Sequence, residues 1–263
     1  MFVMSNAYSF VPQSRSVQYR QALASAMDHR FVDGSLREIE RTNGHNGSTE
    51  LHPSLVFNSD MLSDIPSRMI SFKKNAGVFH QGSRISNFYL VRSGMARLFK
   101  TLSDGRRQII TFVSAGAFLD LNMDGSYNFS SESVTDTHLQ SYKREDIQDY
   151  FAEKPDLLDH VFNILNAQMN RYQDHLVTMG TCFGRQKIAR FILHMQALTS
   201  AHESLSVFVP LAMGRQDIGD YLGMTIESVS RLFNAMDRER LILIVPGGIR
   251  ILNAKALMDL AQS

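Results

Sequence analysis

The chain has 263 residues, of which 44% are hydrophobic, and a formal net charge of +1. That length predicts two domains with ordinary globular cores, and the nearly neutral charge means that a DNA-binding surface must concentrate its basic residues locally. Cys182 is the only cysteine, which excludes intramolecular disulfides and metal or iron–sulfur sites built from several thiolates.

Membrane, export and catalytic signals are missing from the sequence. No apolar run approaches the roughly 20 residues of a membrane-spanning helix. The first residues, MFVMSNAYSFVPQSR, lack the basic and apolar regions of a signal peptide. There is no Gly-rich phosphate loop, metal-spaced His/Asp/Glu cluster or nucleophile elbow. We therefore expect a cytoplasmic, soluble protein that has no membrane partner and is not an enzyme.

Residues 1–55 are expected to form a flexible N-terminal extension. The segment RTNGHNGSTELHP (41–53) has the Gly, Asn and Ser content of a linker. The segment SVQYRQALASAMDHRF (16–31) has apolar residues spaced for one short helix. We favour a partly disordered tail over that helix.

Residues 56–153 are expected to form an antiparallel β-roll. Four runs rich in β-branched and aromatic residues, FYLVRSG, MARLFKT, RQIITFVS and THLQSYK, have the composition of short strands. Gly82, Gly94, Gly105 and Gly116 separate them at intervals of about 11 or 12 residues, a spacing typical of small barrels and rolls. Asp104-Gly105 is a strong hairpin-turn signal.

Residues 154–182 are expected to form a long dimerisation helix, running from about Pro155 to Thr181. Its apolar residues recur every 3.5 positions, a repeat that favours a narrow coiled-coil seam between two copies over a helix packed on its own roll. The seam residues are Leu158, Phe162, Leu165, Met169, Tyr172, Leu176 and Met179. Gly180 and Gly184 mark a break before a second helix, RQKIARFILHMQAL, whose inward residues are expected to be Ile188, Phe191, Ile192 and Met195.

Residues 183–263 are expected to form a winged helix-turn-helix domain. In RQDIGDYLGMTIESVSRLF, Gly219 lies where two helices cross, and Gly223 lies where the turn between them requires positive φ. Thr225 is placed to cap the second helix. Ile218, Leu222, Val229 and Leu232 form the shared core. The segment LILIVPGGIRIL predicts a hairpin around Pro246-Gly247-Gly248.

The second helix presents an unusual polar face: Glu227, Ser230, Arg231 and Asn234. Arg donates to guanine O6 and N7, and Glu accepts from cytosine N4, so the two can read one G·C pair. Each good contact of this kind is worth about 1 to 3 kcal/mol of discrimination. The alternative is a surface ion pair between positions i and i+4, worth a few tenths of a kcal/mol.

With these elements in this order, residues 66–263 resemble the CRP/FNR family of bacterial transcription regulators. The resemblance implies an α+β fold with a cyclic-nucleotide-binding-like roll, a homodimer and recruitment of RNA polymerase to double-stranded DNA. The Glu-x-x-Ser-Arg pattern resembles the FNR and FixK branches, which read TTGAT half-sites. It therefore assigns base reading to Glu227, Ser230 and Arg231 on a TTGAT-N4-ATCAA-like palindrome, in an oxygen-limitation or nitrogen-fixation regulon. The secondary DNA contacts are assigned to Thr225, Ile226, Asn234 and Arg215.

The resemblance also indicates which ligand or cofactor could regulate the protein. In the CRP branch, cyclic nucleotide needs a glycine and an arginine where this chain has Leu119 and Phe129. A buried phosphate without a cation is very costly, so we expect no cyclic nucleotide. One cysteine cannot hold the cluster of the FNR branch. The FixK branch, which generally acts without a cofactor, fits better, and we expect no cofactor.

Three alternatives stay open. Haem could be bound by one of nine histidines, although none stands in a distinctive pattern. Cys182 could sense oxidation at the hinge between helices, with Arg185 and Lys187 lowering its pKa. The chain could also be a ligand-binding or scaffold module whose helix-turn-helix does not bind DNA.

Overall fold

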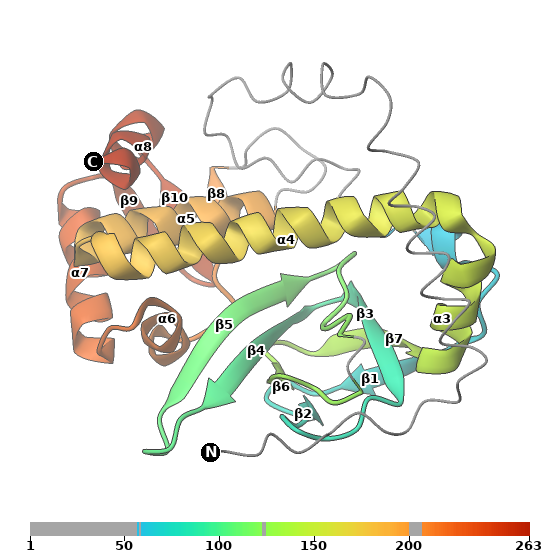
Figure 1. The fold of residues 1–263 in the computed structure, drawn as a ribbon. Coiled ribbons are helices and arrows are strands. Elements are labelled where there is room, and N and C mark those ends of the chain that lie inside the picture. Colours follow the sequence, from blue (N-terminus) through green and yellow to red (C-terminus); the bar gives the residue numbers. More distant parts are fainter. Residues whose placement is uncertain (1–56, 58, 123–124, 200–206) are drawn as a thin grey trace, which may run out of the picture.

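The computed structural model of the chain describes residue 57 and residues 59–122, 125–199 and 207–263. The predicted extension, residues 1–55 with its linker and short helix, lies outside the described residues. The described chain forms an antiparallel β-roll, a long helix and a C-terminal domain of helices and a small sheet (Figure 1). The predicted α+β architecture is therefore confirmed.

The roll consists of two antiparallel sheets with strand orders β1-β7-β3 and β2-β6-β4-β5. Apolar side chains from both sheets are buried in one core. The 3-10 helix η2 (Ser59–Leu62) precedes the strands. The strands are β1 (Ser67–Phe72), β2 (Gly77–Phe79), β3 (Asn87–Ser93), β4 (Met95–Thr101), β5 (Arg107–Ser114), β6 (Ser130–Ser133) and β7 (Thr137–Lys143).

The glycines predicted to separate the strands all adopt positive φ. Their values are 80° at Gly82, 86° at Gly94, 83° at Gly105 and 88° at Gly116. At Gly94 a Cβ atom would also lie 2.5 Å from the Asp136 carbonyl oxygen. Gly105 lies in the turn that joins β4 to β5, so the predicted hairpin is confirmed.

The four predicted runs correspond to β3, β4, β5 and β7, whereas β1, β2 and β6 were not predicted. The sequence of β6, SSES, has little strand propensity, yet Ser131 and Ser133 are buried between neighbouring strands. Helix α3 (Arg144–Glu153) was also missed, because only Ile147 and Phe151 mark its buried face. In these segments tertiary packing outweighs local propensity.

The long helix α4 (Pro155–Thr181) runs from the roll to the C-terminal domain (Figure 1). Val161 and Ile164 pack on the core of the roll. Helix α5 (Gly184–Thr199) follows, so the break falls at Cys182 and Phe183, inside the interval predicted from Gly180 and Gly184.

In the C-terminal domain, α5 contributes the predicted inward residues Ile188, Phe191, Ile192 and Met195, each at most 1% exposed. The hairpin predicted around Pro246-Gly247-Gly248 is confirmed in a sheet of order β8-β10-β9. Strand β8 and helix α8 were not predicted. The elements after α5 are β8 (Phe208–Pro210), α6 (Arg215–Leu222), α7 (Ile226–Arg238), β9 (Ile242–Val245), β10 (Gly248–Ile251) and α8 (Ala254–Gln262).

The roll and the C-terminal domain share apolar packing. Phe99, Ile109 and Phe112 of the β4–β5 hairpin belong to the same buried cluster as Phe191 and Ile218 of the C-terminal domain. Figure 1 shows α6 beside β5 at this junction. Among the described residues, no helix has both the length and the apolar character needed to cross a membrane.

Candidate nucleic-acid interface

Helices α6 and α7 form a helix-turn-helix with the geometry that its glycines require. Gly223 ends α6 in the left-handed conformation, with φ 62° and ψ 43°. At Gly219 a Cβ atom would lie 2.6 Å from the Met224 carbonyl oxygen. Both glycines therefore allow the tight turn, as predicted.

The second helix, α7, is capped and anchored by its own side chains. The Thr225 hydroxyl accepts a hydrogen bond from the Ser228 backbone N–H at 3.2 Å, which is the predicted N-cap. Val229, Phe233 and Met236 are fully buried. Leu232 is partly buried against the same core. These contacts fix which face of α7 points outward.

The outward face contains the predicted polar residues. Glu227, Arg231 and Asn234 are exposed, Ser230 is half-buried and Ile226 is 39% exposed. Arg231 Nη2 donates to Ser228 Oγ at 3.4 Å. Within the described part of the chain, no ion pair joins Glu227 to Arg231, so the alternative of a surface pair is not what the structure forms.

Glu227 lies in the first turn of α7 and is ionised at neutral pH. The nearby backbone N–H of Glu227 itself and the Thr225 hydroxyl stabilise the carboxylate and hold its pKa below the usual range. Both interactions favour the charged form. Glu227 is therefore presented as a hydrogen-bond acceptor, the chemistry that cytosine N4 requires.

Arg215 does not extend outward with this face. Its guanidinium carbon lies 3.5 Å from the centre of the Phe233 ring, a cation–π contact at the start of α6. Arg215 is half-buried, and burial lowers its pKa. Its contact with DNA remains a prediction, whereas its packing on the helix-turn-helix core is observed.

The residues of the predicted dimer seam on α4 fall into two groups, which differ in how exposed they are in the single chain. Phe162, Leu165, Met169 and Leu176 are 37% to 73% exposed. Leu158, Tyr172 and Met179 are half-buried against their own chain. Phe183, seven residues after Leu176, is 81% exposed and extends the exposed stripe beyond the predicted seam.

Cys182 is half-buried at the end of α4, where the hinge was predicted. The two cations expected to lower its pKa are engaged elsewhere. The Arg185 guanidinium forms an ion pair with Glu239, and Lys187 Nζ donates to the Leu222 carbonyl oxygen at 3.5 Å. A redox role of Cys182 remains a prediction.

In the roll, the two residues at the nucleotide positions of the resemblance are apolar and packed. Leu119 is fully buried. Phe129 packs against the core, with Lys100 Nζ 5.3 Å from its ring centre. The neighbouring Asp120 has a buried Oδ2 that finds no hydrogen-bond partner among the described residues, and burial raises its pKa.

Sequence reasoning missed an ion-pair network between the roll and α6. Arg97 of β4 and Arg107 of β5 both donate to Asp217 of α6. The available signal was Arg97 itself, a charged residue in the middle of the apolar run MARLF. Its partner is 120 positions away, so no local pattern could identify it.

Two family descriptions match the chain: a Crp-like helix-turn-helix domain over residues 186–260 and a cyclic nucleotide-binding domain over residues 69–154. The nitrogen fixation regulation protein FixK of Bradyrhizobium diazoefficiens is 36% identical over 74% of this chain and 83% of that protein. The transcriptional activatory protein AadR of Rhodopseudomonas palustris is 33% identical over 74% of this chain and 81% of that protein. The structure of FixK2 from Bradyrhizobium japonicum is similar with a TM-score of 0.70 and 25% identity, over 74% of this chain and 98% of that one.

Proposed function

Since the chain belongs to the CRP/FNR family of DNA-binding transcription regulators, in its FixK branch, we propose that it binds a palindromic operator as a homodimer and recruits RNA polymerase there. The observation that carries this proposal is the outward face of α7. It exposes one acid and one guanidinium without an ion pair between them, at the end of the helix that enters the major groove in this class of domain.

Arg231 donates to guanine O6 and N7 of the half-site, and Glu227 accepts from cytosine N4 of the same pair. Ser230 contacts a neighbouring base or phosphate. Thr225, Ile226 and Asn234 flank these residues on the exposed side of α7. The expected operator is TTGAT-N4-ATCAA.

The dimer forms through the exposed stripe of α4. Its exposed positions are apolar. Three of them lie seven residues apart and are increasingly exposed: Phe162 at 43%, Met169 at 56% and Leu176 at 73%. A two-fold axis along α4 places two copies of α7 in successive major grooves, roughly 34 Å apart. The palindrome follows from that symmetry.

The names of the relatives suggest which genes this chain regulates. One is called a nitrogen fixation regulation protein and the other a transcriptional activatory protein. We therefore place this chain in a nitrogen-fixation or oxygen-limitation regulon, where it acts as an activator. The apolar packing of Leu119 and Phe129 supports control without cyclic nucleotide.

Salt-titrated binding to a TTGAT-N4-ATCAA duplex and to a scrambled duplex tests the proposal. We expect the palindrome to bind more tightly at every salt concentration. Equal affinity for both duplexes would count against the reading of TTGAT half-sites by α7.

Selection of sites from random duplexes tests the base assignments separately. Arg231→Ala is expected to weaken cognate binding by about 1 to 3 kcal/mol per half-site, with a far smaller loss on nonspecific DNA. Glu227→Ala is expected to relax the choice of G·C at one position while total affinity stays close to that of the wild type. If the selected sites keep G·C as strictly as the wild type does, Glu227 does not read the base.

A further inference from the structure

One carboxylate of the first helix of the helix-turn-helix is shared by two arginines of the roll. Arg97 Nη1 donates to Asp217 Oδ2 at 2.9 Å, and Arg107 Nη2 donates to Asp217 Oδ1 at 2.5 Å. The side chains of Arg97 and Asp217 are only 8% and 11% exposed. Asp217 thus connects two strands of the roll to α6.

Two further carboxylates complete the network. Glu132 of β6 accepts from Arg97 Nη2 at 2.6 Å and from Arg107 Nη1 at 3.4 Å. Asp220 of α6 accepts from Arg107 Nη2 at 3.0 Å. These bonds hold α6 at two positions one turn apart, so the helix can neither slide along β5 nor rotate about its own axis without breaking them.

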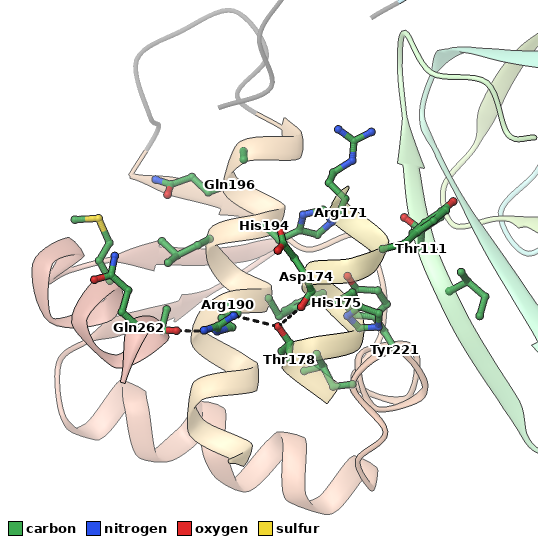
Figure 2. A pocket seen from close by; sticks show the side chains of 18 residues that line it. Thr111, Arg171, Asp174, His175, Thr178, Arg190, His194, Gln196, Tyr221 and Gln262 are labelled. Atoms are coloured by element: carbon green, nitrogen blue, oxygen red, sulfur yellow. Dashed lines mark hydrogen bonds between the residues drawn. The ribbon is translucent and has the colours of Figure 1, made fainter. Parts of the chain in front are cut away.

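Helix α6 also contacts the long helix α4, through Tyr221, four residues after Asp217 and so on the same side of the helix. The Tyr221 ring stacks on His175 of α4, with ring centres 4.0 Å apart and planes 11° apart. Figure 2 shows the two side chains side by side in the pocket. Tyr221 also lies 5.5 Å from the ring of Phe112 in β5. Burial lowers the pKa of His175, so the stack is between two neutral rings. Helix α6 therefore contacts both the roll and α4.

This arrangement determines where the reading face of α7 lies relative to α4. Helices α6 and α7 form one unit, because the Met224 backbone N–H donates to the Gly219 carbonyl oxygen at 3.0 Å and their apolar faces share one core. Buried ion pairs add little net stability, but each bond of this network requires one position of α6 relative to β4 and β5. The network is thus suited to fix an orientation.

We propose that Arg97 and Arg107, acting through Asp217 and Asp220, determine the length of the spacer between the two half-sites of the operator. The inference rests on the proposed function. Each base pair added to a spacer moves the second half-site by roughly 3.4 Å and rotates it by roughly 34°. If the two copies of α7 are fixed relative to α4, they cannot follow this displacement of the second half-site. The two arginines touch no base and act as positioning residues.

Competition binding with spacers of three, four, five and six base pairs, between unchanged TTGAT and ATCAA half-sites, tests this inference. Arg97→Met removes the buried cation. Arg106→Met is the matched control, since Arg106 lies on the same hairpin with a 78% exposed side chain and pairs only with Asp104 within the described chain. The melting temperature of each variant shows that it is folded.

We expect the wild type and Arg106→Met to prefer the four-base-pair spacer over five by about tenfold, and Arg97→Met to show a preference of less than about threefold. Arg97→Met is expected to keep its preference for TTGAT over scrambled half-sites. Asp220→Asn, which weakens one arm of the network without removing volume, is expected to give an intermediate preference.

The possible results separate the two proposals. If the wild type does not distinguish TTGAT from scrambled half-sites, the proposed function fails. If it reads the half-sites and shows no spacer preference, or if folded Arg97→Met and Asp220→Asn keep the wild-type preference, the inference fails. Loss of half-site reading together with spacer preference in folded Arg97→Met would also overturn it, because the network would then only support the domain. Should Arg97→Met not fold, the result for Asp220→Asn decides.

Discussion

Gly219 and Gly180 are both helical glycines, and we predict that alanine at the two positions has opposite effects. At Gly219 the new Cβ would lie 2.6 Å from the Met224 carbonyl oxygen. A Cβ contact is essentially never shorter than 3.0 Å, and ordinary contact begins at 3.4 Å. The turn between α6 and α7 must therefore move by at least 0.4 Å (3.0 minus 2.6), and by 0.8 Å (3.4 minus 2.6) to reach ordinary contact. At Gly180, in α4, the new Cβ would have no heavy atom within 4 Å among the described residues, apart from its chain neighbours and the backbone of its own helix.

The magnitudes follow from two competing terms. Replacing a helical glycine by alanine favours the helix by about 0.5 to 1 kcal/mol. Overpacking costs about 1 to 3 kcal/mol, and we take the upper part of that range at Gly219 because its neighbour is backbone. Gly219→Ala is therefore expected to lose about 1 to 2 kcal/mol, and Gly180→Ala to gain about 0.5 to 1 kcal/mol.

Thermal unfolding followed by circular dichroism measures both effects. For a chain of this size about 1 kcal/mol shifts the melting temperature by roughly 2 to 4 °C. We expect Gly219→Ala to melt roughly 2 to 8 °C lower and Gly180→Ala roughly 1 to 4 °C higher than the wild type. Gly219→Ala should also bind the palindrome more weakly, because the turn orients α7. The reasoning is wrong if Gly219→Ala melts at or above the temperature of Gly180→Ala.

The remaining predictions concern the dimer, the roll and the cap of α7. Leu176 is 73% exposed, so Leu176→Asp should leave the monomer folded but abolish the dimer and specific DNA binding; sedimentation of a wild-type monomer that is still specific for DNA would contradict this. Addition of cAMP or cGMP should not change the melting temperature, because Leu119 and Phe129 offer a phosphate no cation; a saturating increase would refute this. Thr225→Ala should cost about 1 kcal/mol through loss of the bond to Ser228 N–H. Urea unfolding measures this cost, with Thr181→Ala as the comparison, because the Thr181 hydroxyl donates to the Val177 carbonyl oxygen of its own helix and otherwise contacts only the neighbouring Cys182 Sγ among the described residues.

Local patterns in the sequence were sufficient for the elements that carry their own signals. The turn glycines, including Gly105 and Gly223, were identifiable because positive φ is costly for every other residue type. The cap at Thr225 and the buried face of α7 were identifiable because they depend on neighbours within one helical turn. Those two features together orient Glu227 and Arg231, so the candidate DNA-reading face was predictable from the amino-acid sequence alone.

The tertiary structure decided what depends on residues far apart in the chain. Strand β6 exists because its serines fill a place between β2 and β4, although their own propensity is low. Arg97 and Asp217 are 120 positions apart in the sequence. The sequence around Asp217 does not distinguish it from an exposed charged residue, and the only local signal at Arg97 is its place within an apolar run. The division of the α4 seam into exposed Leu176 and half-buried Tyr172 likewise depends on how the two domains pack. Local sequence specifies helices, turns and caps, because short-range sterics and hydrogen bonds determine them. The docking of α6 on the roll is specified only in the folded chain, where Arg97 and Arg107 meet Asp217 in a mostly buried contact.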